Sequence, residues 1–235
     1  MPEQPGEAFE IVELRTGRVA PLGPAGVPSG IDKQQVDGPV AAGPLGLEGD
    51  QHGDQKNHGG PHKALHAYAL AHLPLWAAEL PHRADYFRPG AFGENLVVAG
   101  ATEADFCLGD RWRIGSALAE VSQARQPCWR LNLRFDLPDM ARRVQETGRS
   151  GWYFRVIEPG VIAAGDRGAL AERPHPEWTL HRVSHLLYHD RMNRPALEEL
   201  AALPGLTESW QRLVDARLAS GQTENWSRRL ETPKI

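Results

Sequence analysis

Glycine and proline interrupt this chain at short intervals, and that pattern limits most strongly the folds it can form. Between residues 9 and 170, apolar stretches of strand length alternate with Gly and Pro, and the 235 residues include 24 glycines and 19 prolines. Apolar stretches bounded by turn-forming residues are typical of β-strands. Many short strands with frequent turns favour a β-barrel or a β-sandwich over a parallel α/β sheet. We therefore expect a mainly β fold with helices appended to it.

Four stretches within this part are candidate strands: residues 11–14, 95–98, 111–114 and 117–121. Gly115 separates the last two and predicts a hairpin. A second hairpin is predicted over residues 156–164, around Pro159-Gly160. Two helices are also expected here. Residues 64–77 have a roughly amphipathic period, although Pro74 limits it, and residues 139–147 form a shorter candidate.

The pattern changes after Glu172, where residues 173–176, Arg-Pro-His-Pro, have the composition of a linker. The next segment places four apolar residues on one helical face: Leu180, Val183, Leu186 and Leu187. A second helix, residues 196–203, would be entered through Pro195, and a third would be capped by Thr207 and ended by Gly221. Each helix is too short to persist alone and must pack. We expect a β domain at residues 1–172 and a three-helix domain at residues 173–235.

Charge and composition indicate a globular chain that binds neither nucleic acid nor a membrane. Lys and Arg number 26 against 30 Asp and Glu, a formal net charge of −4, so the chain has no overall basic field. No apolar run approaches the roughly 20 residues that a membrane-spanning helix requires. The first residues lack the positive and apolar regions of a secretory signal. We expect a cytoplasmic location.

Two cysteines limit the redox chemistry of the chain. Cys107 and Cys128 are too few for a disulfide framework, and too few for an iron–sulfur cluster held by about four thiolates. No G-x-G-x-x-G motif lies between a strand and a helix, so a dinucleotide-binding fold has no support. We expect no flavin, NAD or iron–sulfur cluster here, and electrons would come from a separate partner.

The densest polar segment, residues 46–66, allows three interpretations. It contains four histidines and two aspartates: His52, His58, His62, His66, Asp50 and Asp54. It could be a glycine-rich turn capped by polar residues. It could form a zinc or iron site, for which His62 and His66 have the i, i+4 spacing. We favour the third interpretation, a loop whose backbone N–H groups near Gly49, Gly53, Gly59 and Gly60 approach the phosphate of a cofactor, with charge added by Lys56 and Lys63.

Cys128 lies in a second polar segment, which is rich in arginine. A single cysteine is most often a buried and inert small hydrophobe. Between residues 122 and 155, however, three acidic residues face seven arginines: Arg125, Arg130, Arg134, Arg142, Arg143, Arg149 and Arg155. Nearby cations favour the thiolate, the form that binds metals, and arginine suits planar contacts with phosphate. Part of this cluster could instead be a solvated helix face. Cys107 has an apolar neighbour on each side and no adjacent cation, so we expect it in the core.

An ordered series of motifs carries a resemblance to a known family. The motifs are residues 46–50 (Gly-Leu-Glu-Gly-Asp), 58–60 (His-Gly-Gly), 63–65 with Tyr68, 92–96 (Phe-Gly-Glu-Asn-Leu), 109–110 (Gly-Asp), the Cys128 segment and 148–160. Together they resemble the MOSC family, named for the C-terminal domain of molybdenum-cofactor sulfurases. The tail, with Trp210, Leu218, Gly221 and residues 226–229, resembles a three-helix extension that one branch of the family carries. Each motif is weak alone, but the series spans about residues 11–230.

The resemblance implies a β-barrel of the pyruvate-kinase-barrel type that binds molybdopterin, with Cys128 as the protein's ligand to molybdenum. It further implies the reduction of N-hydroxylated compounds, including hydroxylaminopurine-type base analogues, with electrons from a separate flavoprotein reductase. Both a monomer and a homodimer stay open.

Candidate roles for individual residues follow from this resemblance. Cys128 and His58 are the candidate catalytic residues, and His58 would relay protons because its unperturbed pKa of about 6.5 permits both forms near neutrality. Asn95 would hydrogen-bond the pterin or the substrate. The candidates for the cofactor phosphate are Lys56, Gly59, Gly60, Lys63, Arg125 and Arg130.

Three other functions stay open from the sequence. The chain could carry molybdenum cofactor, or transfer sulfur on a cysteine persulfide, without reducing a substrate. It could be a metal-dependent hydrolase that uses the histidines of residues 52–66. The three-helix tail could be an interaction module that docks a reductase or closes the active site.

Overall fold

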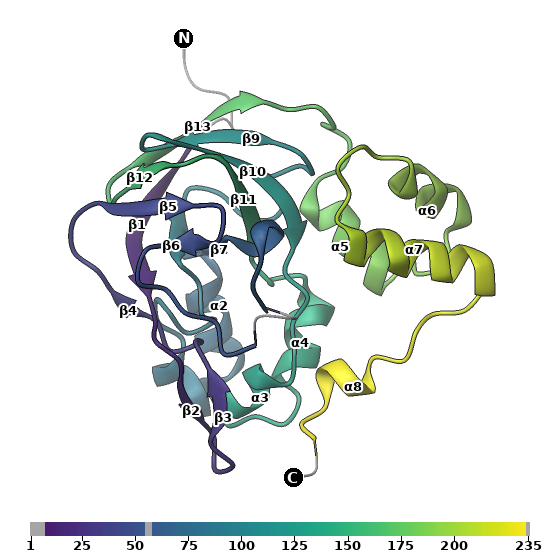
Figure 1. Ribbon diagram of the computed structural model, residues 1–235. Helices are drawn as coiled ribbons and strands as arrows, with labels where there is room; N and C mark the ends of the chain where they lie inside the picture. The colour runs from purple at the N-terminus through teal and green to yellow at the C-terminus, as the bar shows by residue number, and fades with distance from the viewer. Residues whose placement is uncertain (1–7, 55–57, 234–235) are drawn as a thin grey trace.

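A closed barrel of seven strands forms the body of the protein (Figure 1). The structure, a computed structural model, describes residues 8–54 and 58–233. The strands follow one another around the barrel in the order β13-β9-β10-β11-β7-β8-β1, and β1 pairs with β13 to close it. In chain order they are β1 (Ala8–Thr16), β7 (Leu65–Ala69), β8 (Leu96–Ala99), β9 (Arg111–Ile114), β10 (Ala117–Ala124), β11 (Trp152–Glu158) and β13 (Arg167–Glu172). Neighbours are antiparallel except β7 and β8, which are parallel. The predicted mainly β fold is confirmed.

Short strands extend the barrel on one side. β4 (Gln34–Gln35) pairs with the end of β1. β2 (Ala20–Leu22) and β3 (Val27–Ser29) form a hairpin. A separate three-stranded sheet consists of β12 (Gly160–Ile162), β5 (Val40–Gly43) and β6 (Gly46–Leu47). β6 is the first part of the polar segment that precedes β7.

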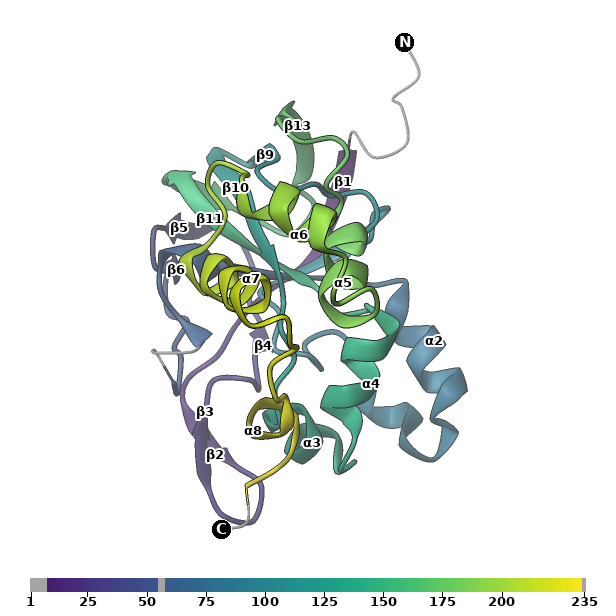
Figure 2. The ribbon, with the colours of Figure 1, turned by 90° about the vertical axis from the view of Figure 1, so that its right-hand side faces the viewer.

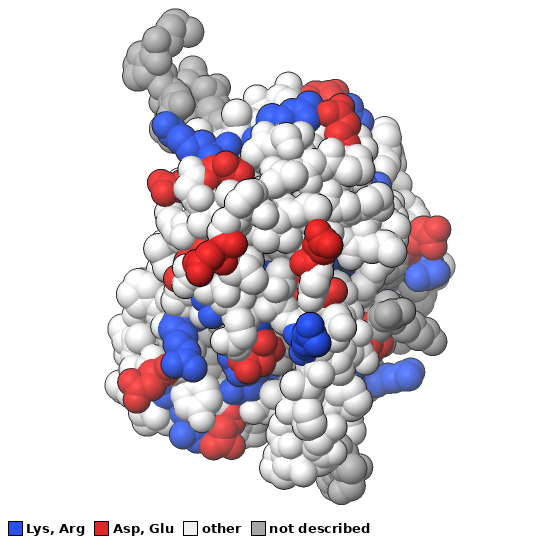
Figure 3. Space-filling view, turned by 60° about the vertical axis from the view of Figure 1, so that its left-hand side comes forward, with Lys and Arg blue, Asp and Glu red and all other residues white. Residues whose placement is uncertain are grey.

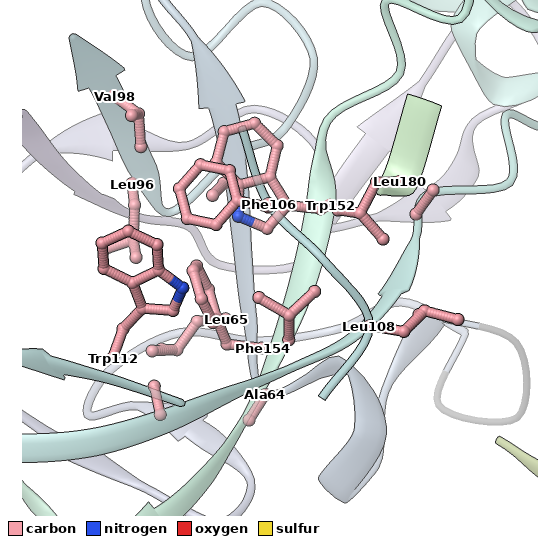
Figure 4. Packing of buried hydrophobic residues seen from close by; sticks show 14 of the residues in the cluster. Ala64, Leu65, Leu96, Val98, Phe106, Leu108, Trp112, Trp152, Phe154 and Leu180 are labelled. Atoms are coloured by element: carbon pink, nitrogen blue, oxygen red, sulfur yellow. The ribbon is translucent and has the colours of Figure 1, made fainter. Parts of the chain in front are cut away.

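Aromatic side chains fill the barrel interior, as closure of a small barrel requires (Figure 4). The rings of Phe106 and Trp152 lie 4.3 Å apart, and Trp112 lies 5.0 Å from Phe106. Leu180, which comes from the tail, belongs to the same buried cluster. The core of the barrel therefore continues into the tail.

A second buried cluster lies under the helices at the other end of the barrel. It is covered by α2 (His72–Glu79), the 3-10 helix η2 (Pro81–Tyr86), α3 (Arg130–Phe135) and α4 (Met140–Thr147). Phe92 stacks on Tyr68 at 4.2 Å and lies 4.9 Å from Phe135. This packing fixes the start of α3, next to Cys128.

The predicted helix over residues 64–77 is wrong in its first half. Those residues form the short 3-10 helix η1 (Pro61–Lys63), then strand β7, and only α2 is helical. Every residue of β7 is buried because Leu65, Ala67 and Ala69 pack in the barrel core, whereas Tyr68 on the opposite face packs in the cluster under the helices. A strand buried on both faces shows no alternation of polar and apolar residues, so its pattern is easily mistaken for that of a helix. The shorter helix predicted over residues 139–147 is confirmed as α4.

The hairpin predicted over residues 156–164 is also wrong. Only Pro159 separates β11 from β12, but β12 pairs with β5, whereas β11 pairs with β10 and β7. The turn at Pro159 thus moves the chain from the barrel to the small sheet. The hairpin predicted around Gly115 is confirmed by the pairing of β9 with β10.

Three helices of the tail lie against one side of the barrel, as predicted (Figure 2). They are α5 (Leu180–Tyr188), α6 (Arg194–Ala201) and α7 (Glu208–Ser220). Thr207 precedes α7, but its side chain makes no capping hydrogen bond. Gly221 ends α7 in the left-handed conformation, with φ of 65°. A fourth short helix, α8 (Ser227–Leu230), was not predicted and lies beside α3.

Charged residues of both signs are interspersed on the face seen in Figure 3, with wide uncharged areas between them. Within the described part of the chain, no helix is both long enough and apolar enough to cross a membrane.

Candidate functional site

Cys128 lies in the loop that joins β10 to α3, and its side chain reaches a cavity. The residue is 8% exposed. The surrounding cavity draws residues from β3, the polar segment before β7, β7 itself, β11 and α3. Its polar lining consists of Ser29, Lys33, Gln51, His52, Asp54, His58, Lys63, His66, Asn95, Arg125, Arg130 and Tyr153. Several segments that are far apart in the sequence thus meet around one thiol.

His58 contacts the Cys128 thiol directly. The His58 Nε2 atom lies 3.2 Å from Cys128 Sγ, a hydrogen-bonding distance for sulfur. On the other side of the ring, His58 Nδ1 lies 3.6 Å from Asp54 Oδ2. The order carboxylate, imidazole, thiol resembles the arrangement that activates a cysteine for nucleophilic or metal-binding chemistry.

Opposing effects set the pKa of Cys128. Burial by itself raises the pKa of the thiol. The hydrogen bond and charge of His58, the charge of Arg125 and the backbone N–H of Arg130 outweigh burial and lower the pKa to about 7. A pKa of about 7 makes the thiolate accessible at neutral pH, and thiolate is the form that binds metals and attacks electrophiles.

Cys107 provides an internal contrast. Its thiol donates to the Pro176 carbonyl at 3.4 Å, and burial together with the negative charge of Asp110 raises its pKa to about 11. It is 1% exposed, in agreement with its predicted place in the core.

Three of the predicted phosphate-binding cations reach the cavity. Arg125 is 5% exposed, and its Nη1 atom has no hydrogen-bond partner among the described residues. Arg130 lies over the Trp129 ring, and its Nη1 atom is 3.5 Å from Asp54 Oδ2. The Lys63 ammonium lies 5.9 Å from the centre of the Tyr153 ring, and burial lowers its pKa.

The remaining arginines of the cluster pair with acidic residues outside this cavity. Arg134 pairs with Asp32, Arg142 with Glu231, Arg143 with Asp139, Arg149 with Glu79 and Arg155 with Glu120. The side chains of Arg142 and Arg143 are 46% and 44% exposed, so these two form the solvated helix face considered as an alternative. Of the seven arginines in this part of the sequence, only Arg125 and Arg130 therefore line the cavity.

His66 and Tyr153 complete the wall next to Arg125. The His66 Nε2 atom is buried and lacks a hydrogen-bond partner among the described atoms. Burial, reinforced by the charge of Arg125, lowers the pKa of His66 well below its ordinary value, so the ring is neutral at pH 7. The ring lies 5.0 Å from that of Tyr153. The role of Tyr153 was not predicted, although the residue lies within the matched motif at residues 148–160.

A buried ion pair between Lys33 and Asp50 lies next to Asn95, and its Lys33 member lines the cavity. The Lys33 ammonium donates to both carboxylate oxygens of Asp50, and its Nζ atom lies 2.6 Å from Oδ2. The Asn95 amide donates to Asp50 Oδ2 at 3.0 Å and to the Arg15 carbonyl at 3.1 Å, and its Oδ1 accepts from the His66 backbone N–H. Asn95 thus borders the cavity but uses its amide within the protein. Its contact with a cofactor stays a prediction, and Lys33 gave no signal in the sequence.

The glycines and lysine at the centre of the polar segment do not all meet at this cavity. Gly59 and Gly60 border a separate depression, beside Val19 and Leu45. Gly60 has φ of 92°, a conformation that favours glycine, and it precedes η1. Lys56 lies outside the described residues. The phosphate-binding roles of these three residues stay predictions.

A purely protein-ligated metal site finds little support in the histidines. His62 and His66 do not share a helix, because η1 ends at Lys63 and His66 belongs to strand β7. His62 is influenced by the charges of Arg155 and Glu208, away from the cavity. Among the residues that the structure describes, no group of three or more His, Cys, Asp or Glu side chains is placed to hold a metal ion.

Comparisons with known proteins match the barrel and the tail to two separate family models. A model of the MOSC domain matches residues 54–167, and a model of the YiiM-like 3-alpha helix domain matches residues 178–221. Protein YiiM of Escherichia coli (strain K12) is 41% identical over 219 residues, which are 93% of this chain and 97% of that protein. The crystal structure of YiiM from Escherichia coli superposes with a TM-score of 0.78 and 38% identity, covering 92% of this chain and all of that one.

A second relative is a longer protein. The protein named "Reductase" of Gibberella moniliformis is 38% identical over 212 residues, which are 89% of this chain but only 37% of that protein. The fold, the two matched models and the relatives agree that this chain belongs to the MOSC family. Within it, the chain is similar to the YiiM proteins, whose characteristic helical domain its tail matches.

Proposed function

We propose that this protein reduces N-hydroxylated compounds, such as hydroxylaminopurine-type base analogues, with a molybdenum cofactor bound at the Cys128 cavity. The observation that carries the proposal is the thiol of Cys128, whose pKa of about 7 and contact with His58 provide a thiolate at the cavity wall. Metals are bound by thiolates, and soft transition metals favour sulfur ligands. A cytoplasmic location is part of the same proposal.

The donor atoms around the cavity fit a molybdopterin that carries a phosphate. Arg125 Nη1 and His66 Nε2 are buried polar atoms without a partner among the described residues. Buried polar groups are normally hydrogen-bonded, so such atoms are expected to meet a ligand. Arg125, Arg130 and Lys63 would meet the negative charge of the phosphate, and Cys128 would bind the metal.

The protein's own groups would orient the reaction and supply protons. When bound, the cofactor supplies a metal that takes up two electrons and delivers them. Conversion of an N–OH group to N–H and water consumes those two electrons and two protons. His58 lies between Asp54 and Cys128, where it can hold a proton at Nε2 and pass it into the cavity. The buried wall around His66 and Tyr153 keeps bulk water away from the reacting centre.

A separate flavoprotein reductase would deliver the electrons. A relative named "Reductase" contains the matched region as about a third of its length, so reduction is named for a protein in which this region is joined to other sequence. We propose that, in the present protein, the electron-donating part is another chain. Assembly with that chain would make turnover depend on added reductase.

A carrier or sulfur-transfer protein that reduces no substrate is the second candidate, and the same nucleophilic thiolate favours it. The two functions separate in one assay. The protein, loaded with cofactor and supplied with a chemical reductant, should convert hydroxylaminopurine to the amine. A loaded protein that shows no conversion, together with a persulfide on Cys128 in protein purified without cofactor and without reductant, would favour sulfur transfer.

Elemental analysis tests the site directly. Protein purified from a host that makes the cofactor should contain about one molybdenum per chain. Cys128→Ala should lose the metal, whereas the matched control Cys107→Ala should keep it because Cys107 lies apart in the core. Retention of molybdenum in Cys128→Ala would remove the basis of the proposal. Zinc or iron in both variants would favour a hydrolase instead.

A further inference from the structure

The loop that carries Cys128 is held from both sides by one residue of the short helix α8. The Arg229 Nη1 atom donates a hydrogen bond to the Pro127 carbonyl at 2.6 Å. The Trp129 backbone N–H donates in turn to the Arg229 carbonyl at 2.7 Å. Pro127 and Trp129 are the neighbours of Cys128 in the sequence, so Arg229 brackets the thiol-bearing residue.

Several contacts fix Arg229 itself. Its Nη2 atom donates to Gln145 Oε1 on α4, and its guanidinium lies 5.7 Å from the centre of the Tyr188 ring on α5. The next residue, Leu230, is 2% exposed in the cluster under the helices, and its carbonyl accepts from Asn132 Nδ2 at 2.8 Å. α8 is therefore anchored to α3, α4 and α5 at the same time.

The segment that leads into α8 is also anchored. The buried Arg217 of α7 pairs with Glu224 through two hydrogen bonds of 2.8 Å. Glu224 also accepts from Trp226 Nε1 at 2.7 Å, and the Trp226 ring packs edge-on against Tyr188. The direction from which Arg229 reaches the loop is thus set by the three-helix part of the tail.

The position of the Cys128 backbone decides which groups its sulfur contacts. The sulfur lies 3.2 Å from His58 Nε2, and it also accepts from the Arg130 backbone N–H at the start of α3. Hydrogen bonds weaken steeply with distance and misalignment, so a shift of the loop by about 1 Å would weaken both contacts. No regular strand or helix includes residues 125–128.

We propose that Arg229 is a positioning residue for Cys128, and that the tail acts through it to keep the thiol against His58. A planar guanidinium can hold the Pro127 carbonyl and the Gln145 side chain together, which the single ammonium of lysine cannot do in the same geometry. The tail would then serve the site of the barrel without lining the cavity. This inference deepens the proposed function, since it concerns the same thiol.

The test measures the thiol and not the activity of loaded protein. The rate of alkylation of Cys128 by iodoacetamide is followed from pH 5 to 10 in full-length chain purified without cofactor. The Cys107→Ala background leaves one thiol to report. Arg229→Gln should raise the pH midpoint by about one unit and slow alkylation at pH 7 about fivefold, because less thiolate is present. Arg229→Lys, which keeps the charge, should fall between it and the parent chain.

Arg228→Gln is the matched control, since Arg228 precedes Arg229 on α8 and is exposed. It should leave the midpoint unchanged. Thermal unfolding of each variant separates positioning from general support of the fold. An Arg229→Gln chain that melts earlier but keeps the parent pH midpoint would overturn the inference. If that variant does not fold, Arg229→Lys decides by the same criterion. Absence of molybdenum or of reductase activity would contradict the proposed function but would not change this readout.

Discussion

The two cysteines show how the surroundings of one residue type determine its chemistry. Both thiols are buried, and burial raises the pKa of both. Cys107 lies beside the carboxylate of Asp110, which raises its pKa further, to about 11. Cys128 has His58 and Arg125 as neighbours, and its pKa falls to about 7. At neutral pH the thiolate form is therefore accessible to Cys128 and not to Cys107.

Removal of the His58 ring should restore an ordinary or higher pKa to Cys128. His58→Ala deletes both the hydrogen bond and the positive charge that favour the thiolate, while burial remains. The thiol pKa should rise to at least about 8.5, and alkylation at pH 7 should slow more than about tenfold. In the parent protein, the thiol pKa is lower in the folded state than in the unfolded chain, so the thiolate stabilises the fold at a pH above the unfolded pKa. This stabilisation is lost as the pH falls through the folded pKa of about 7.

The pH dependence of alkylation, measured in the Cys107→Ala background, checks this prediction. His62→Ala is the matched control, because His62 belongs to the same polar segment but does not line the cavity. An unchanged midpoint in His58→Ala would mean that Arg125 and the α3 N-terminus alone stabilise the thiolate.

The sequence identified part of the site because charge and cysteine chemistry are visible along the chain. The residues that are predicted from the sequence and border one cavity include Cys128, His58, Lys63, Arg125 and Arg130. The contact of His58 with Cys128 spans 70 residues and arises only when the barrel closes. Lys33 could not be found, because an isolated lysine gives no signal until its partner Asp50 is placed beside it.

At the scale of elements, one buried carboxylate joins a helix to a barrel strand. Glu103 accepts from the Gly151 backbone N–H at 2.6 Å, just before β11, and its other oxygen lies 2.6 Å from His72 Nε2 at the start of α2. Gly151 in turn accepts from the Arg125 backbone N–H at 2.9 Å. Glu103 therefore ties the helical end of the molecule to the loop that leads toward Cys128.

Glu103→Ala should destabilise the protein by about 3 kcal/mol, because it leaves two buried hydrogen-bonding groups without a partner. Denaturation with urea, followed by circular dichroism, would measure the loss. Glu146→Ala on the exposed face of α4 should change the free energy of unfolding by less than about 0.5 kcal/mol. Equal effects of the two substitutions would contradict a bridging role for Glu103.

Elements whose pattern depends on local sequence were predicted, and those that depend on distant partners were not. The turn at Gly115 brings β9 and β10 together, and the apolar face of α5 has the helical period. β7 and the pairing of β12 were not predicted, because β7 pairs with β11 and β12 pairs with β5, and both partners are distant in the sequence. The residues next to β7 and β12 in the sequence do not reveal these pairings.

At the scale of the molecule, barrel and tail share one buried cluster. Trp178, Leu180 and Trp210 of the tail belong to the same cluster as Phe106 and Trp152 of the barrel. The domain boundary predicted at residue 172 coincides with the end of β13, yet the packing crosses it. Independent domains would unfold separately, whereas parts that share a core unfold together.

The shared cluster predicts a single unfolding transition for the full chain. Exposure of one part would uncover apolar surface of the other, so neither should persist alone. Tryptophan fluorescence, far-ultraviolet circular dichroism and calorimetry should give the same midpoint. Two resolved steps, one of them mainly helical, would instead show that the tail unfolds independently.

The bracket around Cys128 also has a consequence for the order of events in the cell. Arg229 lies 102 residues after Pro127. A ribosome completes the strands of the barrel before it has made α8, and chains acquire structure from the N-terminus during synthesis. The hydrogen bonds of Arg229 to the Cys128 loop therefore form only after translation has passed residue 229. Under the proposed function, the cofactor would therefore enter the site after α8 has been made, because a nascent barrel presents Cys128 before Arg229 can hold its loop.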